Sequence, residues 1–317
     1  MAIGLEQHVE QKSRRILGIK ARSRPRSLAQ REELYAYLFL TPWIIGFVLF
    51  TAGPMIAVFG ISLFRTNFLT ETYYVGSKWW RAVFTDMLVR KALLNTLYYV
   101  AVSVPGGTCL AMTIAILLNQ GMKAQSVWRT IYFLPSLVSG VAVSVLWQWL
   151  YHPDIGLFND LLDKIGIVGP QWIWSSEWAM PSIIAMSLWG AGGAMLIYLA
   201  GLRGIPTVLY EAAEIDGAGT WRRFWHVTIP MLTPTIFFNV VMNLIGSWQV
   251  FTQAFVMTEG GPNNATLTMV LHIYRTGFQS TFFGYASAQA GLLFLVILIF
   301  ILTSLRSTSF WVHYERV

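Results

Sequence analysis

Residues 210–234 read YEAAEIDGAGTWRRFWHVTIPMLTP. This polar, charged segment has helix–glycine–helix character, and it lies between two long apolar runs of the chain. A membrane protein that ends one span, continues into such a segment and then begins the next span is expected to contact something at the membrane surface. The surrounding sequence indicates which side of the membrane it faces.

The composition indicates a membrane protein. Of 317 residues, 55% are hydrophobic and 12% are charged, whereas a soluble domain carries about 25% charged residues. The net charge of +7 is explained by where the basic residues lie, so we expect no nucleic-acid partner. The one cysteine, Cys109, excludes an intrachain disulfide, and the five scattered histidines form no HExxH pair. We therefore expect no metal site.

Six segments are apolar enough to cross a membrane as helices, which takes about 20 residues each. They cover residues 35–64, 92–118, 130–151, 180–202, 229–258 and 286–305. We therefore predict an all-α integral membrane protein with a six-span domain over 34–310. A basic tail over 1–33 precedes this domain, and a short tail over 311–317 follows it.

The orientation follows from Lys and Arg beside the spans, because cytoplasmic loops carry an excess of both. The tail 1–33 and the segment 203–223 carry Lys and Arg, and the loop 152–179 is acidic. The loop 65–91 is basic although this orientation places it outside. The tail 1–33 and the segment 203–223 together carry more Lys and Arg than this loop. With six spans, both termini and the segment 203–228 are predicted to be cytoplasmic.

The predicted spans lack charged residues, and this absence bears on the transport mechanism. No Asp, Glu, Lys or Arg lies in the central part of any predicted span, although such residues usually mark proton relays and ion coupling. An ion-coupled secondary carrier stays an alternative, because some sodium sites use carbonyls and hydroxyls. Only Lys12 is followed by Ser or Thr, and Gln11 precedes it, so the chain has no phosphate-binding loop. We expect a transport subunit, not an enzyme.

The segment between the fourth and fifth spans is predicted to form two short helices at an angle. Pro206 suits the first turn of a helix that runs to Asp216, and Gly217 can end it in a left-handed conformation. Thr220 is a good N-cap for the second helix, and Pro230 then opens the next span. Such a pair of short helices can insert into a groove of a partner protein. The alternative is an amphipathic connector on the lipid headgroups.

The same segment closely resembles the EAA loop of bacterial ABC importer membrane subunits. The family pattern reads E-A-A, a glycine at a fixed offset, then I-x-L-P. This chain has Glu211-Ala212-Ala213, then Asp216-Gly217-Ala218, and its last part runs from Val227 to Pro230. Val227 stands for Ile, and Ile229 for Leu, and both are mild departures.

Two further stretches resemble the carbohydrate importers within that family. Thr258–Thr266 is similar to their T-x-G-G-P-x-x-x-T element, and Tyr37–Pro42 is typical of the start of their first span. The resemblance covers about residues 35–310 and is greatest to larger-partner permeases of the maltose type. It implies a type I ABC importer permease fold in the inner, cytoplasmic membrane of a bacterium.

The resemblance also implies partners. The EAA loop, at 204–228 here, would form coupling helices that fit a cleft of a separate ATPase subunit, with Glu211 facing a basic or polar group. Ala212 and Ala213 would allow close approach, Gly217 would form the bend, and Asp216 belongs to the same ATPase-coupling set. ATP and Mg²⁺ would bind to an ATPase dimer, and this chain would hold no cofactor. A second, similar permease and a periplasmic or lipid-anchored solute-binding protein would complete the importer.

A sugar site is expected on the spans that flank the loop. The fifth span carries Asn239, Asn243 and Ser247 on one helical stripe, and further polar, small or aromatic residues lie on both spans. These are Gly246, Trp248, Trp189, Gly190 and Gly193. Helix packing is the alternative role for such residues.

Aligned on the EAA loop without gaps, the resemblance implies sugar contacts at a related set of positions. The matching residues are Met186, Trp189, Gly190, Gly193, Asn243, Gly246, Ser247 and Val250. Val250 replaces a polar residue of the maltose type and Gly246 an aromatic one, so the cargo is expected to differ from maltose. An anionic sugar derivative or glycerol phosphate is the other substrate class, mildly disfavoured because few basic residues reach the middle of the spans.

Overall fold

The computed structural model describes residues 28–68 and 72–312, which form almost entirely helices. The chain divides into two compact units, Met1–Ala57 and Val58–Val317. Most of the tail predicted over 1–33, and most of the one predicted over 311–317, lies outside the described residues.

The described part of the first unit is a single helical run. It consists of α2 (Leu28–Phe47), the π-helical turn η1 (Val48–Ala52) and the start of α3 (Gly53–Ile61). The Gly53 N–H donates to Val48 O, five residues earlier, just before Pro54, which has no N–H to donate. A π-turn adjusts the helix at this proline without ending it, so the apolar stretch Tyr35–Ile61 stays helical.

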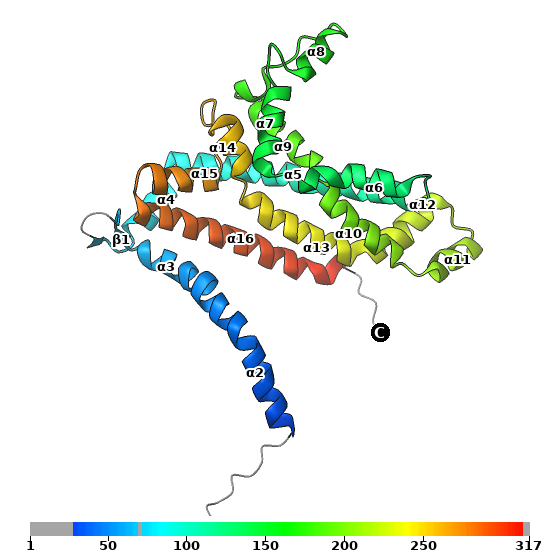
Figure 1. The fold of residues 1–317 in the computed structure, drawn as a ribbon, viewed down its shortest axis with the longest axis horizontal. Coiled ribbons are helices and arrows are strands. Elements are labelled where there is room, and N and C mark those ends of the chain that lie inside the picture. The colour runs from blue at the N-terminus through cyan, green and yellow to red at the C-terminus, as the bar shows by residue number, and fades with distance from the viewer. Residues whose placement is uncertain (1–27, 69–71, 313–317) are drawn as a thin grey trace, which may run out of the picture. The chain divides into compact units, whose positions relative to one another are not determined.

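The second unit has a layer of helices that run side by side (Figure 1). Its members are α5 (Met87–Asn119), α6 (Gln125–Phe133), α10 (Gly192–Arg203), α13 (Ile229–Trp248) and α16 (Phe283–Trp311). An arm of shorter helices rises from the middle of this layer (Figure 1). The arm contains α7 (Gly140–Leu150), α8 (Leu157–Asp163), η3 (Trp172–Trp174), α9 (Ala179–Trp189) and α14 (Thr252–Thr258).

Short elements cover the two opposite ends of the layer (Figure 1). One end carries β1 (Phe64–Arg65), β2 (Tyr73–Tyr74), α4 (Lys78–Thr85), α15 (Met269–Tyr274) and the π-turn η5 (Arg275–Gln279). β1 and β2 are antiparallel, with Phe64 opposite Tyr74. The other end carries α11 (Thr207–Ile215), α12 (Thr220–Arg223) and the π-turn η4 (Phe224–Thr228).

Breaks divide several of the expected spans. Within the described ranges, four helices are long and apolar enough to cross a membrane, or up to six if each of two bent pairs is one span. The expected span 130–151 is one such pair, Gln125–Leu137 and Gly140–Leu150, bent by 98° around η2 (Leu134–Leu137). The expected span 180–202 is the other pair, bent by 46° between α9 and α10.

The fifth helix differs from its expected bounds at both ends. It runs from Thr220 to Trp248 as one helix, so α12 is its first turn, not a separate short helix. Its N-cap is Gly219, and Thr220 is the first helical residue. The π-turn η4 precedes Pro230, as η1 precedes Pro54, which explains why this proline does not begin a new helix. The stretch expected to continue to 258 is instead a linker followed by α14.

Three apolar clusters hold the second unit together. One joins α5, α10 and α13 through side chains such as Leu118, Tyr198 and Leu232. A second joins the far ends of α5, α13 and α16 to α15, and a third joins the arm to α5 through Tyr99. α10 also meets α6 backbone to backbone, because a Cβ on Gly192 would lie 2.0 Å from Tyr132 O.

Candidate functional site

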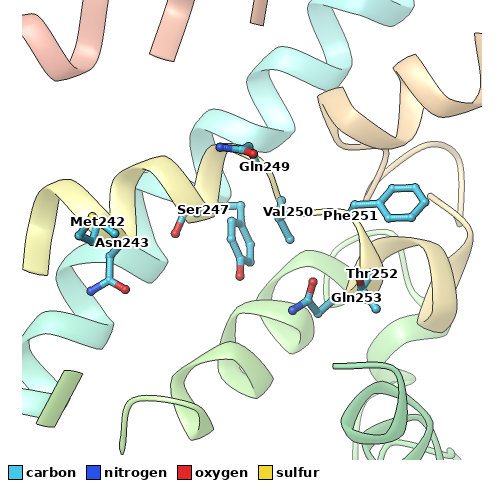
Figure 2. A pocket seen from close by; sticks show the side chains of 10 residues that line it. Met242, Asn243, Ser247, Gln249, Val250, Phe251, Thr252 and Gln253 are labelled. Atoms are coloured by element: carbon cyan, nitrogen blue, oxygen red, sulfur yellow. The ribbon is translucent and has the colours of Figure 1, made fainter. Parts of the chain in front are cut away.

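Two adjoining cavities lie where helices of the layer break off into the arm. The first, which we call the α13–α14 cavity, measures about 310 Å³. Its lining residues are Tyr99, Met242, Asn243, Gly246, Ser247, Gln249, Val250, Phe251, Thr252 and Gln253. Figure 2 shows Asn243 and Ser247 on α13 and Gln253 on α14 around the same space, with the Phe251 ring turned away from it.

The second, which we call the α9–α10 cavity, measures about 260 Å³. It is lined by Tyr99, Ser103, Gly107, Ser187, Leu188, Gly190, Ala191, Ala194, Asn243, Ser247 and Gln253. Tyr99, Asn243, Ser247 and Gln253 therefore line both cavities. The two spaces are neighbours that share one polar wall.

Local hydrogen bonds fix the linker between α13 and α14. Gln249 Nε2 donates to Ile245 O at 3.1 Å, within the last turn of α13. Thr268 Oγ1 donates to Val250 O at 2.9 Å from the segment before α15. These bonds satisfy carbonyls that a helix end leaves without partners. The break is thus a built feature that brings Thr252 and Gln253 to the cavity.

The lining is suited to binding neutral polar groups. Amides come from Asn243, Gln249 and Gln253, and hydroxyls from Tyr99, Ser103, Ser187, Ser247 and Thr252. Amides and hydroxyls each donate and accept hydrogen bonds. No Asp, Glu, Lys, Arg or His is among the described residues that line either space. This wall offers contacts to hydroxyl groups, and the described side chains that line it carry no charge at neutral pH.

Four of the sequence-predicted sugar contacts line the cavities: Gly190, Asn243, Gly246 and Ser247. Trp189 and Gly193 lie nearby but line neither. The Trp189 ring packs edge-on against Trp147, with their centroids 5.9 Å apart. Val250, from the gapless alignment, lines the α13–α14 cavity, whereas Met186 is buried in the arm.

The other two predicted contacts lie inside the protein. Trp248 is 1% exposed and packs against Phe300, with ring centroids 5.2 Å apart. Asn239 is 3% exposed, and its Nδ2 donates to Thr235 O at 3.0 Å in its own helix. Neither residue lines either cavity, so the sugar contacts expected at these two positions stay predictions.

Sequence reasoning missed the contribution of α5. Tyr99 and Ser103 are 5% and 7% exposed and line the cavities together with Gly107. These three residues are spaced at i, i+4 and i+8, so they share one face of the predicted second span. That stripe was the signal that could have identified them.

The segment at the other end of the layer carries the EAA pattern. The Gly217 backbone is left-handed, with φ at +74°. Its N–H donates to Glu214 O at 3.0 Å, and the Ala218 N–H donates to Ala213 O at 2.9 Å. These two bonds form a Schellman motif, which ends a helix at a glycine. The bend predicted at Gly217 is therefore present.

Two side-chain contacts tie α11 to the helix that follows the bend. Tyr210 Oη and Thr228 Oγ1 lie 3.0 Å apart, and Arg223 Nη1 lies 3.2 Å from Glu214 Oε2. Glu211, in contrast, is exposed and makes no ion pair or side-chain hydrogen bond with the described residues. It is free to meet a partner.

The rest of this segment also presents side chains outward. Ala212 and Asp216 are exposed, and Ala213 is half-buried. Large apolar side chains are exposed beside them, with Ile215 at 88% and Trp221 at 74%. Small residues next to exposed apolar ones allow close packing of another surface.

A polar cluster at the opposite end links α5 to α16. Asp86 accepts hydrogen bonds from Leu88 N–H at 2.7 Å and from Tyr285 Oη at 2.6 Å. Burial alone would raise the pKa of Asp86, but these hydrogen bonds hold it below its ordinary value. His272 is buried beside Gln289, and its burial lowers its pKa.

Comparisons with known proteins agree with this architecture. Residues 107–309 match the family described as binding-protein-dependent transport system inner membrane component. The chain is 37% identical to the probable ABC transporter permease YesP of Bacillus subtilis, over 94% of this chain and 97% of that one. It is 34% identical to the lactose transport permease LacF of Rhizobium radiobacter, over 86% of this chain and 93% of that one.

Among solved structures, it resembles a chain of a bacterial alginate ABC transporter in complex with an alginate pentasaccharide-bound periplasmic protein. The TM-score is 0.78 at 26% identity, covering 88% of this chain and 95% of that one.

The chain thus belongs to the binding-protein-dependent transport system inner membrane components, the permease subunits of ABC importers. It is a multi-pass membrane permease with the type I importer fold, and it is a transport subunit, not an enzyme. The resemblance based on the EAA pattern is confirmed.

Proposed function

We propose that this chain is a membrane-spanning subunit of an ATP-driven, binding-protein-dependent sugar importer, and that its two polar cavities form part of the sugar passage. The observation that carries the proposal is the wall shared by both cavities, which combines two amides with two hydroxyls at breaks of the layer. Relatives named for lactose transport and for alginate support a carbohydrate cargo.

A separate ATPase subunit would dock on the EAA segment. Glu211 is exposed and without a partner among the described residues, and Ala212 leaves room for a close approach. The ATPase subunits would bind ATP and Mg²⁺ and would hydrolyse the ATP. This chain would bind no cofactor itself.

Both ends of the docking segment lead to the cavities. The helix Thr220–Trp248 runs without interruption from the segment to the linker that borders the α13–α14 cavity. On the other side, α10 runs from Arg203 back to Gly192, beside the lining residues Gly190 and Ala191. Helices are stiff, so movement of the ATPase surface would reach both cavities and alternate their access to the two sides.

The remaining partners complete the importer. A second, similar permease would supply the other wall of the passage, and a solute-binding protein would deliver the sugar at the outer face, as a periplasmic protein accompanies the alginate transporter. The membrane would be the inner membrane of a bacterium, with both termini and the segment 204–228 in the cytoplasm. The excess of Lys and Arg near those parts supports this orientation.

Reversal of the charge at Glu211 tests the docking proposal. We expect Glu211→Lys to abolish ATP-driven uptake of sugar by the complete transporter in proteoliposomes, while the chain still inserts and pairs with the second permease. The reason is that an exposed carboxylate that meets a basic or polar group is replaced by a cation that repels it.

Lys123→Glu serves as the control, because Lys123 is also an exposed charge at the predicted cytoplasmic side and lies outside the EAA segment. Its uptake should be close to that of the unchanged chain. Normal ATP-driven uptake by Glu211→Lys would rule out this docking surface.

A further inference from the structure

Two arginines lie along the contact between α6 and α10. Arg203 is exposed in the last turn of α10, and its Nη2 donates to Gln125 Oε1 at 3.3 Å. Gln125 begins α6 and is itself fixed, because its Nε2 donates to Leu118 O near the end of α5. Arg129 lies four residues after Gln125 and therefore on the same side of α6. Both arginines thus belong to the side of α6 that meets α10.

The charge of these arginines is not balanced within the protein. Neither Arg129 nor Arg203 forms an ion pair with a described residue. Arg129 is half-buried, and its Nε is buried without a hydrogen-bond partner among the described residues. A buried charged group without a partner costs free energy. An anion that reaches both arginines would remove this cost.

The exposed surface of the same helix is apolar and aromatic. Trp128 and Tyr132 are exposed, and their ring centroids lie 6.5 Å apart. Val127 and Ile131 are exposed as well. A small anion alone would leave these side chains without an apolar partner, whereas Trp and Tyr gather where membrane hydrocarbon meets the headgroups. The ligand that fits α6 therefore combines negative charge with an apolar part.

The place of these arginines in the chain puts them at a border of the membrane. Arg129 lies near the start of the apolar helix pair that runs from Gln125 to Leu150, and Arg203 ends the pair that begins at Ala179. Long basic side chains at span ends reach the lipid headgroups. The two arginines therefore meet at one membrane surface, which is the cytoplasmic one in the orientation proposed above.

We propose that Arg129 and Arg203 bind the phosphate of an anionic phospholipid such as phosphatidylglycerol. Their planar guanidinium groups donate to the phosphate oxygens, and the acyl chains lie along Trp128 and Ile131. Basic sites between membrane helices on the cytoplasmic side suit such headgroups. The bound lipid ties α6 to α10 directly before the EAA segment and stabilises this end of the layer.

Competition between two lipids tests the proposed site. The complete transporter, purified in detergent with its partner permease and ATPase subunits, is mixed with equal amounts of phosphatidylglycerol and phosphatidylcholine. Native mass spectrometry then counts the lipids that the transporter retains. We expect phosphatidylglycerol to be retained at least about tenfold in preference to phosphatidylcholine. Equal retention of the two lipids would overturn the inference.

Substitutions of the two arginines separate charge from packing. Arg129→Gln and Arg203→Gln should each lower the preference for phosphatidylglycerol about fivefold, the effect of one cation near a membrane surface. Arg129→Lys keeps the charge and should keep most of the preference, which a role in packing alone would not predict. Arg306→Gln, which removes an exposed cation of α16, is the matched control with unchanged preference.

Arg203 is exposed, so its replacement reports on the site even if Arg129→Gln does not assemble with its partners. An unchanged lipid preference in either glutamine variant would contradict the site.

A free phosphate and a carboxylate of a partner subunit are the competing anions. A large excess of glycerol 3-phosphate should leave the bound lipid in place, because it has no acyl chains to meet the apolar surface of α6. The two permeases without the ATPase subunits should retain the same amount of phosphatidylglycerol as the complete transporter. Displacement by glycerol 3-phosphate, or loss of the lipid when the ATPase subunits are added, would overturn the inference in favour of that other anion.

Discussion

His272 is a buried histidine whose surroundings favour its neutral form. Burial lowers its pKa most, and the nearby Arg275 lowers it further, while Asp86 partly opposes both. Gln289 Nε2 lies 3.2 Å from its Nε2. In the unfolded chain His272 takes up a proton near pH 6.5, whereas the folded chain resists this. Folding stability is therefore lost as the pH falls below about 6.5 towards the lower pKa of the folded state.

Replacing His272 should reduce this pH dependence. We expect the melting temperature of purified His272→Gln to fall less between about pH 7.5 and 5.5 than that of the unchanged protein, because glutamine does not titrate in this range. His226→Gln, at an exposed histidine, is the control and should keep the original pH dependence. If the melting temperatures of His272→Gln and of the unchanged protein fall equally over this pH range, His272 does not cause the pH dependence.

At the scale of elements, the contact between α6 and α10 determines where the α9–α10 cavity lies. α10 begins at Gly192, whose missing side chain lets it meet Tyr132 O and the Phe133 backbone. A larger residue would push α10 away from α6 and move the start of α10, which borders the cavity. Backbone atoms on both sides cannot rotate aside as side chains can.

Two adjacent glycines provide a direct comparison. Gly192→Ala should destabilise the protein by about 1–3 kcal/mol, as overpacked sites do, because its Cβ would lie 2.0 Å from Tyr132 O. Gly193→Ala should cost no stability, because a Cβ there meets no atom within 4 Å and alanine favours helix. Thermal unfolding of both variants in the same detergent checks this, and equal melting temperatures would contradict the described packing.

Local features of these elements could be predicted from sequence, and tertiary ones could not. Gly217 was identified as a helix end because a left-handed turn depends on its own backbone. Asn243 and Ser247 were placed on one stripe by helical spacing alone. Hydropathy, however, measures apolar content and not direction, so the bends around η2 and before α10 were missed. Which face of α13 borders the cavity depends on α5 and α14, and helical spacing alone could not show that Trp248 lies away from it.

At the scale of the whole molecule, one continuous path joins the two functional regions. The EAA segment lies at one end of the helical layer (Figure 1). The cavities are lined by residues of the layer helices α5 and α13 and of the arm helices α9 and α14, where the arm leaves the layer. The helix Thr220–Trp248 and α10 connect them. The exposed EAA segment is the surface on which we propose that a separate ATPase subunit docks.

Uptake of a labelled sugar into proteoliposomes tests this account most directly. The vesicles would contain either this chain with its partner permease alone, or both permeases with the ATPase subunits, and the solute-binding protein would be present in each case. We predict uptake only when the ATPase subunits and ATP are both present. Uptake by the permeases alone, driven by an ion gradient, would contradict the account and identify a secondary carrier.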